Sequence, residues 1–315
     1  MKPVATLAAP FLGALLLAQN AAGPPAEASM EQRIAGMVAD FRGVMGIAAI
    51  DLSSGATIAV NGDTRFPTAS TIKTAVMLEA HHQAAEGRLR LDATFALRDA
   101  DKVGGSGVLN GLTPGLILTT ADLIHLMIVL SDNTATNLLI DRLGTARINA
   151  RLDSYGLRET RLFRPTFRDG KPDVLPELER EFGLGMTTPR DMARLMALIA
   201  HGEAVSRQAS DTMLATLRGQ QDRAMIPRLL PSMEGLTIGN KTGTDAEKHP
   251  GPDGTRRHVR ADAAIVSAPG FSYVLAIYAR QVDDTRWGIE NDALTTGARI
   301  SRLLFEHYSR ARKRP

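Results

Sequence analysis

Two residues near the start of the chain have the side chains that nucleophilic catalysis requires. Ser70 and Lys73 lie at the beginning of a segment predicted to form a helix over 71–86, which Gly87 ends. Residues three apart share a helix face, so Lys73 can reach the Ser70 hydroxyl. A serine is a weak nucleophile until a base removes its proton, and a lysine can be that base if burial or nearby positive charge lowers its pKa. This spacing indicates a serine activated by a lysine.

A second group, Ser131-Asp132-Asn133, lies where two predicted helices meet. The Ser131 hydroxyl can relay a proton to a leaving nitrogen, and the Asn133 amide can bind both a substrate carbonyl and Lys73. The same three residue types favour helix N-caps, so this group taken alone is better explained as a cap.

A third group, Lys241-Thr242-Gly243, ends a predicted strand. Lys241 can hold a substrate carboxylate electrostatically, and Gly243 lets a ligand approach the strand backbone closely. The N–H of the next residue, Thr244, can pair with that of Ser70 as an oxyanion hole. Taken alone, this group is a strand end followed by a turn.

The elements that must position these groups change in type along the chain. We expect both chain ends to share one antiparallel sheet flanked by helices, with an all-helical region inserted, an α/β fold. This divides the chain into an α/β part (29–66 and 221–315) and a helical part (67–220). The predicted strands are 44–52, 56–60, 236–240, 263–266 and 271–280, and the predicted helices are 31–41, 71–86, 120–130, 133–143, 146–155, 189–200 and 288–310, with Thr145 and Thr188 as N-caps.

Composition restricts the class of protein. The chain has 315 residues, is 44% hydrophobic and 23% charged, and its net charge of only +3 gives no reason to expect a nucleic-acid partner. The absence of cysteine excludes disulfides, thiolate zinc sites and a thiol nucleophile. Residues 1–28 have the pattern of an export signal, which begins with Lys2 and continues with a short apolar run and then small residues. No later segment is long and apolar enough to span a membrane. We therefore expect a soluble protein, periplasmic or secreted.

The three groups occur together in the order that marks class A β-lactamases and penicillin-binding proteins. Residues 66–73, Phe-Pro-Thr-Ala-Ser-Thr-Ile-Lys, resemble the nucleophile segment of class A β-lactamases, and residues 131–139 resemble their second motif with its usual continuation. Thr188-Pro189, at the end of a long loop, extends the resemblance over essentially the whole mature chain. The resemblance implies a serine hydrolase with the β-lactamase/transpeptidase fold that acts on β-lactam-type amides.

The resemblance also implies a role for each site residue. Ser70 attacks the carbonyl and becomes acylated, Lys73 activates it, and Ser131 passes the proton to the leaving nitrogen. The substrate is a small molecule, either a β-lactam or a peptidoglycan-like peptide. We expect neither a metal nor an organic cofactor, and we expect the protein to be a monomer. The residues that bind the substrate are then Asn133, Lys241, Thr242, Gly243, Thr244 and a second cation, Arg260, for which Arg228 is a rival because an insertion at 248–255 blurs the match.

The resemblance fails at one position. Class A β-lactamases carry a loop glutamate that positions the water for deacylation, in the pattern T-R-L-D-R-x-E-P. Here residues 160–167 are Thr-Arg-Leu-Phe-Arg-Pro-Thr-Phe, so Thr166 stands where the glutamate belongs, and Gly170 falls where an asparagine is expected. A threonine cannot act as a general base near neutral pH, which puts turnover in question but not acylation.

Three interpretations follow from this departure. The enzyme hydrolyses β-lactams, slowly or with another carboxylate, for which Glu177, Glu179 and Glu181 are candidates, although a solvated charged stretch explains them better. It is a D,D-peptidase or esterase of cell-wall-like substrates that deacylates by another route. Or it acylates and stops, as a penicillin-binding sensor.

Overall fold

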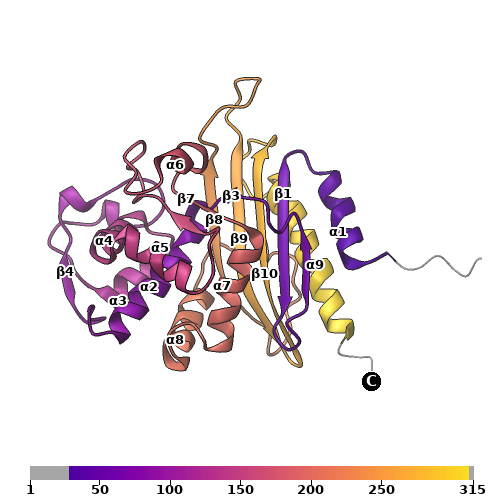
Figure 1. Ribbon diagram of the computed structural model, residues 1–315, viewed down its shortest axis with the longest axis horizontal. Helices are drawn as coiled ribbons and strands as arrows, with labels where there is room; N and C mark the ends of the chain where they lie inside the picture. Colours follow the sequence, from indigo (N-terminus) through magenta and orange to yellow (C-terminus); the bar gives the residue numbers. More distant parts are fainter. Residues whose placement is uncertain (1–27, 312–315) are drawn as a thin grey trace, which may run out of the picture.

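The structure is a computed structural model that describes residues 28–311 of the chain. Its centre is a five-stranded antiparallel sheet with the strand order β2-β1-β10-β9-β8 (Figure 1). The predicted sheet, to which both chain ends contribute, is therefore confirmed. Its strands are β1 (Val44–Asp51), β2 (Thr57–Val60), β8 (Thr237–Ala246), β9 (His258–Ala268) and β10 (Phe271–Val282).

The central strands are buried on both faces. In β9, Ala263 and Ile265 belong to one hydrophobic core, whereas Ala264 and Val266 belong to the other. Successive side chains of a strand point to opposite faces, so a strand segment covered on both sides is a continuous apolar run, as residues 263–266 of β9 and 273–279 of β10 are. Burial of these runs between two layers of helices fixes the sheet in place.

Helices form the two outer layers (Figure 1). On one face α9 (Asp292–Ala311) packs against β10, with α1 (Met30–Ala39) beside it against β2. On the other face α7 (Pro189–His201) packs across β1, β9 and β10, and α8 (Arg207–Arg218) packs on β8. The rest of the helical region lies beyond them and comprises α2 (Lys73–Ala85), α3 (Thr120–Val129), α4 (Asn133–Leu143) and α5 (Thr145–Ser154).

Side-chain caps fix where several helices begin. The hydroxyls of Thr119 and Thr188 accept from the backbone N–H groups of Asp122 and Asp191, at the start of α3 and α7. The prediction that Thr145 caps α5 is wrong. Gly144 is the N-cap, with a φ of 85° that suits glycine, and Thr145 is the first helical residue.

Strands β8 and β9 are longer than predicted. β8 continues to Ala246, so Lys241-Thr242-Gly243 lies inside the strand and not at its end. β9 extends beyond the predicted core on both sides, from His258 to Ala268. The polar residues of both extensions weaken the apolar signal, but their backbones pair with each other along the full length.

The long loop before α7 has regular structure of its own. It contains α6 (Pro176–Phe182) and β7 (Gly185–Thr187). β7 pairs with β3 (Phe66–Pro67) on one side and β6 (Arg161–Leu162) on the other, which ties the end of the loop to the residues just before Ser70. The remaining short elements are η1 (Ala69–Ile72), η2 (Asp99–Asp101), η3 (Leu109–Gly111) and the pair β4 (Thr94–Ala96) and β5 (Ile117–Thr119).

Two predictions concern the membrane and the N-terminus. Among residues 28–311, no helix is both long and apolar enough to cross a bilayer. The predicted export signal, 1–28, lies outside the described residues except for its last position.

Candidate active site

Ser70 lies in η1, the single turn that leads into α2. The preceding residue, Ala69, has a φ of 42°, a left-handed conformation that is costly for a residue with a Cβ atom. The turn is anchored on both sides, because the Thr68 N–H donates to the Gly185 carbonyl at 2.9 Å and the Thr71 hydroxyl donates to the Thr68 carbonyl at 2.7 Å. These bonds hold Ser70 half-buried at the surface of a cavity.

Lys73 is fully buried one turn after Ser70. Its Nζ donates to Asn133 Oδ1 at 2.7 Å, to the Ser131 carbonyl at 2.7 Å and to Ser131 Oγ at 3.1 Å. The first two predicted groups therefore meet around the Nζ atom of Lys73. The predicted contact between Lys73 and the Ser70 hydroxyl stays a prediction.

The surroundings of Lys73 lower its pKa well below the usual lysine value. Burial is the main cause, because it disfavours the charged form, and the positive charge of Lys241 adds to it, against an opposing effect of Asp132. Lowering of the pKa makes a neutral amine accessible, which is what a base for Ser70 must be.

Ser131 connects the second group to the third. Its Oγ receives hydrogen bonds from both Lys73 Nζ and Lys241 Nζ, each at 3.1 Å. Its φ of 55° is again left-handed, and it precedes the capping residue of α4, Asp132. A hydroxyl between two lysine nitrogens can give a proton away and recover it from either neighbour.

The glycine-rich stretch that follows residue 103 forms a wall of this site. The buried Asp132 carboxylate accepts from the N–H groups of Val108 (2.7 Å) and Leu109 (2.9 Å), and Asn133 Nδ2 donates to the Gly104 carbonyl at 3.1 Å. A Cβ atom at Gly107 would lie 2.2 Å from Asp132 Oδ2, so only glycine fits there. Sequence reasoning missed that these glycines allow the loop to pack on the second group.

Strand β8 passes directly beside Ser70. A Cβ atom at Gly243 would lie 3.2 Å from the Ser70 backbone nitrogen and 2.8 Å from the Thr68 carbonyl oxygen. Glycine at this position therefore permits a close approach, but to the backbone around Ser70 and not, as the sequence predicted, to a ligand. Thr244, whose N–H was predicted to help bind an oxyanion, is the next residue.

Lys241 is fully buried on the same strand. Its Nζ donates to the Thr242 carbonyl at 2.8 Å as well as to Ser131. Burial lowers its pKa to about 8, against opposing effects of Asp222 and Asp262. It is still mostly an ammonium group at neutral pH and can attract a substrate carboxylate.

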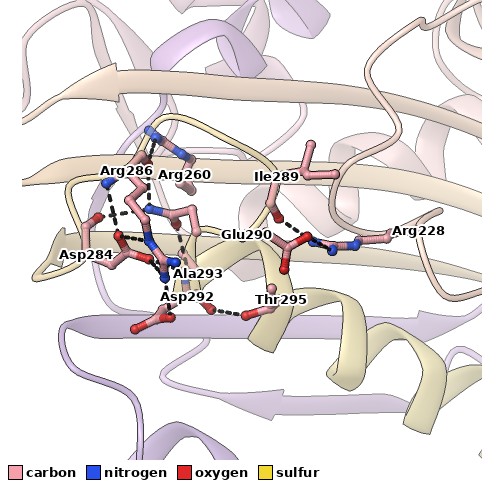
Figure 2. Close-up of polar contacts among 10 residues, drawn as sticks. Arg228, Arg260, Asp284, Arg286, Ile289, Glu290, Asp292, Ala293 and Thr295 are labelled. Atoms are coloured by element: carbon pink, nitrogen blue, oxygen red, sulfur yellow. Dashed lines mark hydrogen bonds and ion pairs between the residues drawn. The ribbon is translucent and has the colours of Figure 1, made fainter.

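Arg260 lies in register with Thr244 across the β8–β9 pair and is buried; Figure 2 shows its contact with Arg286. Its guanidinium donates to the Val259 and Arg286 carbonyls, both at 3.1 Å, and its central carbon lies 4.8 Å from the centre of the Trp287 ring. The Trp287 ring lines a cavity that contains Ser70. Arg260 is thus a fixed positive charge behind the wall of the site.

Arg228, the rival, has different partners. It pairs with Glu290 at 2.8 Å and donates to the Ile289 carbonyl, in a separate group of contacts at the start of α9 (Figure 2). Neither arginine lines a cavity that contains Ser70, but Arg260 lies over Trp287, which does line one. These contacts favour Arg260 over Arg228 as the second cation.

Thr166 is buried in the long loop, next to α4. Its N–H donates to Asn137 Oδ1 at 2.8 Å, its hydroxyl donates to the same oxygen at 2.9 Å, and its carbonyl accepts from Asn137 Nδ2 at 3.0 Å. Asn137 therefore binds both the N–H and the carbonyl group of residue 166. Thr166 also lines a cavity with Ser70, but its hydroxyl is a donor to an amide oxygen and not a base.

The three loop glutamates do not replace the missing carboxylate in either Ser70 cavity. Glu177 is exposed and pairs with Arg180, and Glu181 lies 3.8 Å from Arg280. Glu179 is buried but bound to Arg164 Nε at 2.8 Å, and this pairing, together with Lys248, holds its pKa below the usual value despite burial.

Two cavities meet at Ser70. The Ser131 cavity, of about 280 Å³, includes Ser70, Ser131, Asp222, Thr242 and Thr244. The Asn133 cavity, of about 460 Å³, includes Ser70, Asn133, Thr166, Asp245 and Trp287. Ser106 lines both cavities, and sequence reasoning missed it because a serine in a glycine-rich loop has no distinguishing pattern. In residues 28–311, no group of three or more acidic or histidine side chains is arranged to hold a metal ion.

The comparisons with known proteins agree with this geometry. Residues 29–308 match the beta-lactamase enzyme family. Beta-lactamase L2 of Stenotrophomonas maltophilia is 32% identical over 77% of this chain and 78% of its own length. The crystal structure of a beta-lactamase from Sphaerobacter thermophilus is 33% identical, with a TM-score of 0.74 over 88% of this chain and 97% of that one.

A second kind of relative has been solved with its nucleophile acylated. A point mutant of PBP-A, described as an acyl-enzyme complex with penicillin G, is 29% identical to this chain, with a TM-score of 0.73 over 89% of this chain and 96% of that one. The family match covers nearly all the described residues, and the predicted resemblance is confirmed. The chain is a serine hydrolase that belongs to the beta-lactamase enzyme family.

Proposed function

We propose that this protein opens β-lactam amides by forming an acyl-enzyme on Ser70, and that release of the acyl group is its slow step. The observation that carries the proposal is the buried Lys73, whose Nζ contacts both Ser131 and Asn133 one turn after Ser70 and whose pKa is strongly lowered. The relatives named as β-lactamases support the substrate class.

In acylation, neutral Lys73 takes the Ser70 proton while Oγ bonds to the lactam carbonyl carbon. The charge that develops on the carbonyl oxygen meets the N–H groups of Ser70 and Thr244, which the close approach of Gly243 brings near each other. The C–N bond then breaks as Ser131 gives its proton to the leaving nitrogen. Ser131 recovers a proton from the ammonium of Lys73, so the protons balance.

The substrate carboxylate is bound on the Ser131 side. Lys241 and Thr242 lie there, and Lys241 keeps its charge below a pKa of about 8. Arg260 adds positive potential from behind Trp287. Asn133, held by Lys73 and the Gly104 carbonyl, has an amide that can contact the acyl side of the substrate.

Deacylation needs a water molecule that loses a proton to a base. A carboxylate in this role contributes about 10²- to 10⁴-fold, and the hydroxyl of Thr166, which donates to Asn137, does not supply it. We therefore propose slow turnover by Lys73 alone. The acylated state is then the predominant form during reaction.

A second candidate is a D,D-peptidase or esterase of cell-wall-like substrates. It is favoured by a further cavity of about 330 Å³ that shares Arg164, Asp169 and Asp245 with the Asn133 cavity and gives room for a longer acyl chain. A penicillin-binding sensor would use the same acylation without turnover. We further propose that the protein is exported by the signal at 1–28 and acts as a monomer on a small molecule; size exclusion and the N-terminal sequence of the exported protein test these.

The test of the proposed function is labelling with a fluorescent penicillin. The wild type should carry one label, and Ser70→Ala should carry none. A Ser70→Ala variant that still becomes labelled would overturn the nucleophile assignment. A folded wild type that never becomes labelled would overturn the substrate class.

A further inference from the structure

We propose that Asp245 recognises an ammonium group on the acyl side chain of the substrate, so that the protein selects substrates with an α-amino acyl group. This rests on the proposed acylation of Ser70. It names a subsite of the Asn133 cavity and the class of substrate that the subsite takes. The argument begins with the face of β8 on which Asp245 lies.

Asp245 shares a strand face with Gly243. Alternate residues of a strand point to the same side, and the Cβ position of Gly243 lies 3.2 Å from the Ser70 nitrogen. Two residues further along the strand is a step of about 6.7 Å. The Asp245 side chain therefore points to the same side as the nucleophile, one step along the edge of the sheet.

The cavities show which part of a substrate would lie there. Ser131, Lys241 and Thr242 define the side of the leaving nitrogen and its carboxylate, and two of them line the Ser131 cavity. The acyl part of the substrate must then extend into the other cavity at Ser70, which Asn133 and Asp245 line. Asp245 also lines the next cavity along, so the acyl chain has to pass it.

Asp245 is the carboxylate of this cavity that has no cation of its own. The other one, Asp169, is bound to Arg164 and to Lys248 at 3.0 Å, and the same two cations bind Glu179. This group of two cations and two carboxylates is balanced in charge. Across residues 28–311 Asp245 makes no ion pair, and its carboxylate accepts the Ala246 N–H at 2.8 Å.

The electrostatic surroundings fit a cationic ligand. Desolvation by nearby protein atoms raises the pKa of Asp245, and the negative charge of Asp169 adds to this, while Arg164 and Lys248 oppose it. The positive charge of a ligand ammonium beside the carboxylate would favour the ionised form of Asp245 and so counteract both effects that raise its pKa. A ligand carboxylate in the same place would be repelled.

The reach of such a ligand also fits. In an α-amino acyl β-lactam, five bonds separate the lactam carbonyl carbon from the amino nitrogen. At backbone-like bond lengths, that is a span of about 6 Å. It matches the step from Gly243, beside Ser70, to Asp245.

Three penicillins test this directly, because they differ by one substituent on the same carbon. Benzylpenicillin carries hydrogen there, ampicillin an ammonium and carbenicillin a carboxylate. The measurement is the second-order acylation constant of each, followed by intact mass. The wild type should prefer ampicillin to benzylpenicillin, and Asp245→Asn should lower that ratio about three- to fivefold, as expected for an ion pair open to solvent. The acylation constant of carbenicillin should rise in the same variant.

Asp222→Asn is the matched control, because Asp222 lines the Ser131 cavity and not the acyl side. Its ampicillin to benzylpenicillin ratio should equal that of the wild type, whatever the absolute rates. The benzylpenicillin rate of Asp245→Asn shows in the same experiment that the variant is folded. An unchanged ratio in Asp245→Asn, or an equal fall in Asp222→Asn, would overturn the subsite while leaving the proposed function standing. If no penicillin forms an adduct with the wild type, both are refuted.

Discussion

Replacement of Thr166 by glutamate should turn a slow enzyme into a faster one. Thr166 lines the Asn133 cavity together with Ser70, and Asn137 holds its backbone in both directions at 2.8 and 3.0 Å. These two bonds involve only main-chain atoms of residue 166, so Thr166→Glu keeps them. The longer side chain would then place a carboxylate in the cavity.

The expected changes in stability and deacylation rate follow from the hydrogen bond that the variant loses and the general base that it gains. The variant loses the hydrogen bond from the Thr166 hydroxyl to Asn137 Oδ1, which is 2.9 Å long and contributes about 1 kcal/mol to stability. It gains a general base, which contributes about 10²- to 10⁴-fold to a rate. Deacylation should therefore accelerate by about that factor, while the acylation constant stays within severalfold of the wild type.

The assay is the decay of the acyl-enzyme, measured by intact mass after a short exposure to benzylpenicillin. Thr166→Gln is the control, since it has the same shape without the base, and its adduct should last as long as that of the wild type. Equal acceleration in the glutamine variant would show that space and not basicity limits deacylation. An adduct of unchanged lifetime in Thr166→Glu would refute the account of the slow step.

Three further predictions concern the lysines and the loop. Lys73→Met should lower the acylation constant by about 10²- to 10⁴-fold without unfolding the protein, and near-normal labelling would exclude Lys73 as the base. The acylation constant should fall as pH rises through about 8, where Lys241 loses its charge, and should also fall below the lowered pKa of Lys73, where Lys73 gains a proton; a flat profile above pH 8 would contradict the role of Lys241. Glu179→Gln should lower the free energy of unfolding in urea by about 3 kcal/mol, because it leaves the buried Arg164 with Asp169 alone, and a loss below about 1 kcal/mol would show that the pair is not structural.

Helix starts and the order of the elements could be predicted because they depend on local chemistry. Thr188 followed by proline begins α7, with Gly202 in a left-handed conformation at its end. The residues 133–143 predicted for α4 agree with the structure at both ends, since Asp132 caps the helix and Gly144 stops it. The division of the chain at 66 and 221 into two parts stays a prediction.

Strand lengths and the loop could not be predicted in the same way. β8 runs on through Lys241 and Asp245, and polar residues in a strand are explained only by the partner strand and the cavity beside it. The loop before α7 has a helix and a strand because Phe182 and Met186 pack on Phe163, a contact between residues about 20 apart. Such packing has no signature in the local sequence.

The predicted site residues needed the fold to be brought together. Lys73, Ser131 and Lys241 lie far apart in sequence, and only the structure gives the shared contacts at Ser131 Oγ. The wall formed by Gly104 and Gly107 was missed because glycine has no side chain to signal a role. The need for glycine at residue 107 is visible only in the structure, where an added Cβ atom would overlap the Asp132 carboxylate.

The most direct test of the central claim follows one chromogenic cephalosporin with the purified protein, recording the early burst, the later rate and the intact mass. We predict a burst of about one equivalent of product, a slow later rate, and a mass adduct on Ser70 that persists and is absent in Ser70→Ala. Sustained rapid turnover without an adduct would contradict slow deacylation, and an adduct in Ser70→Ala would contradict the nucleophile itself.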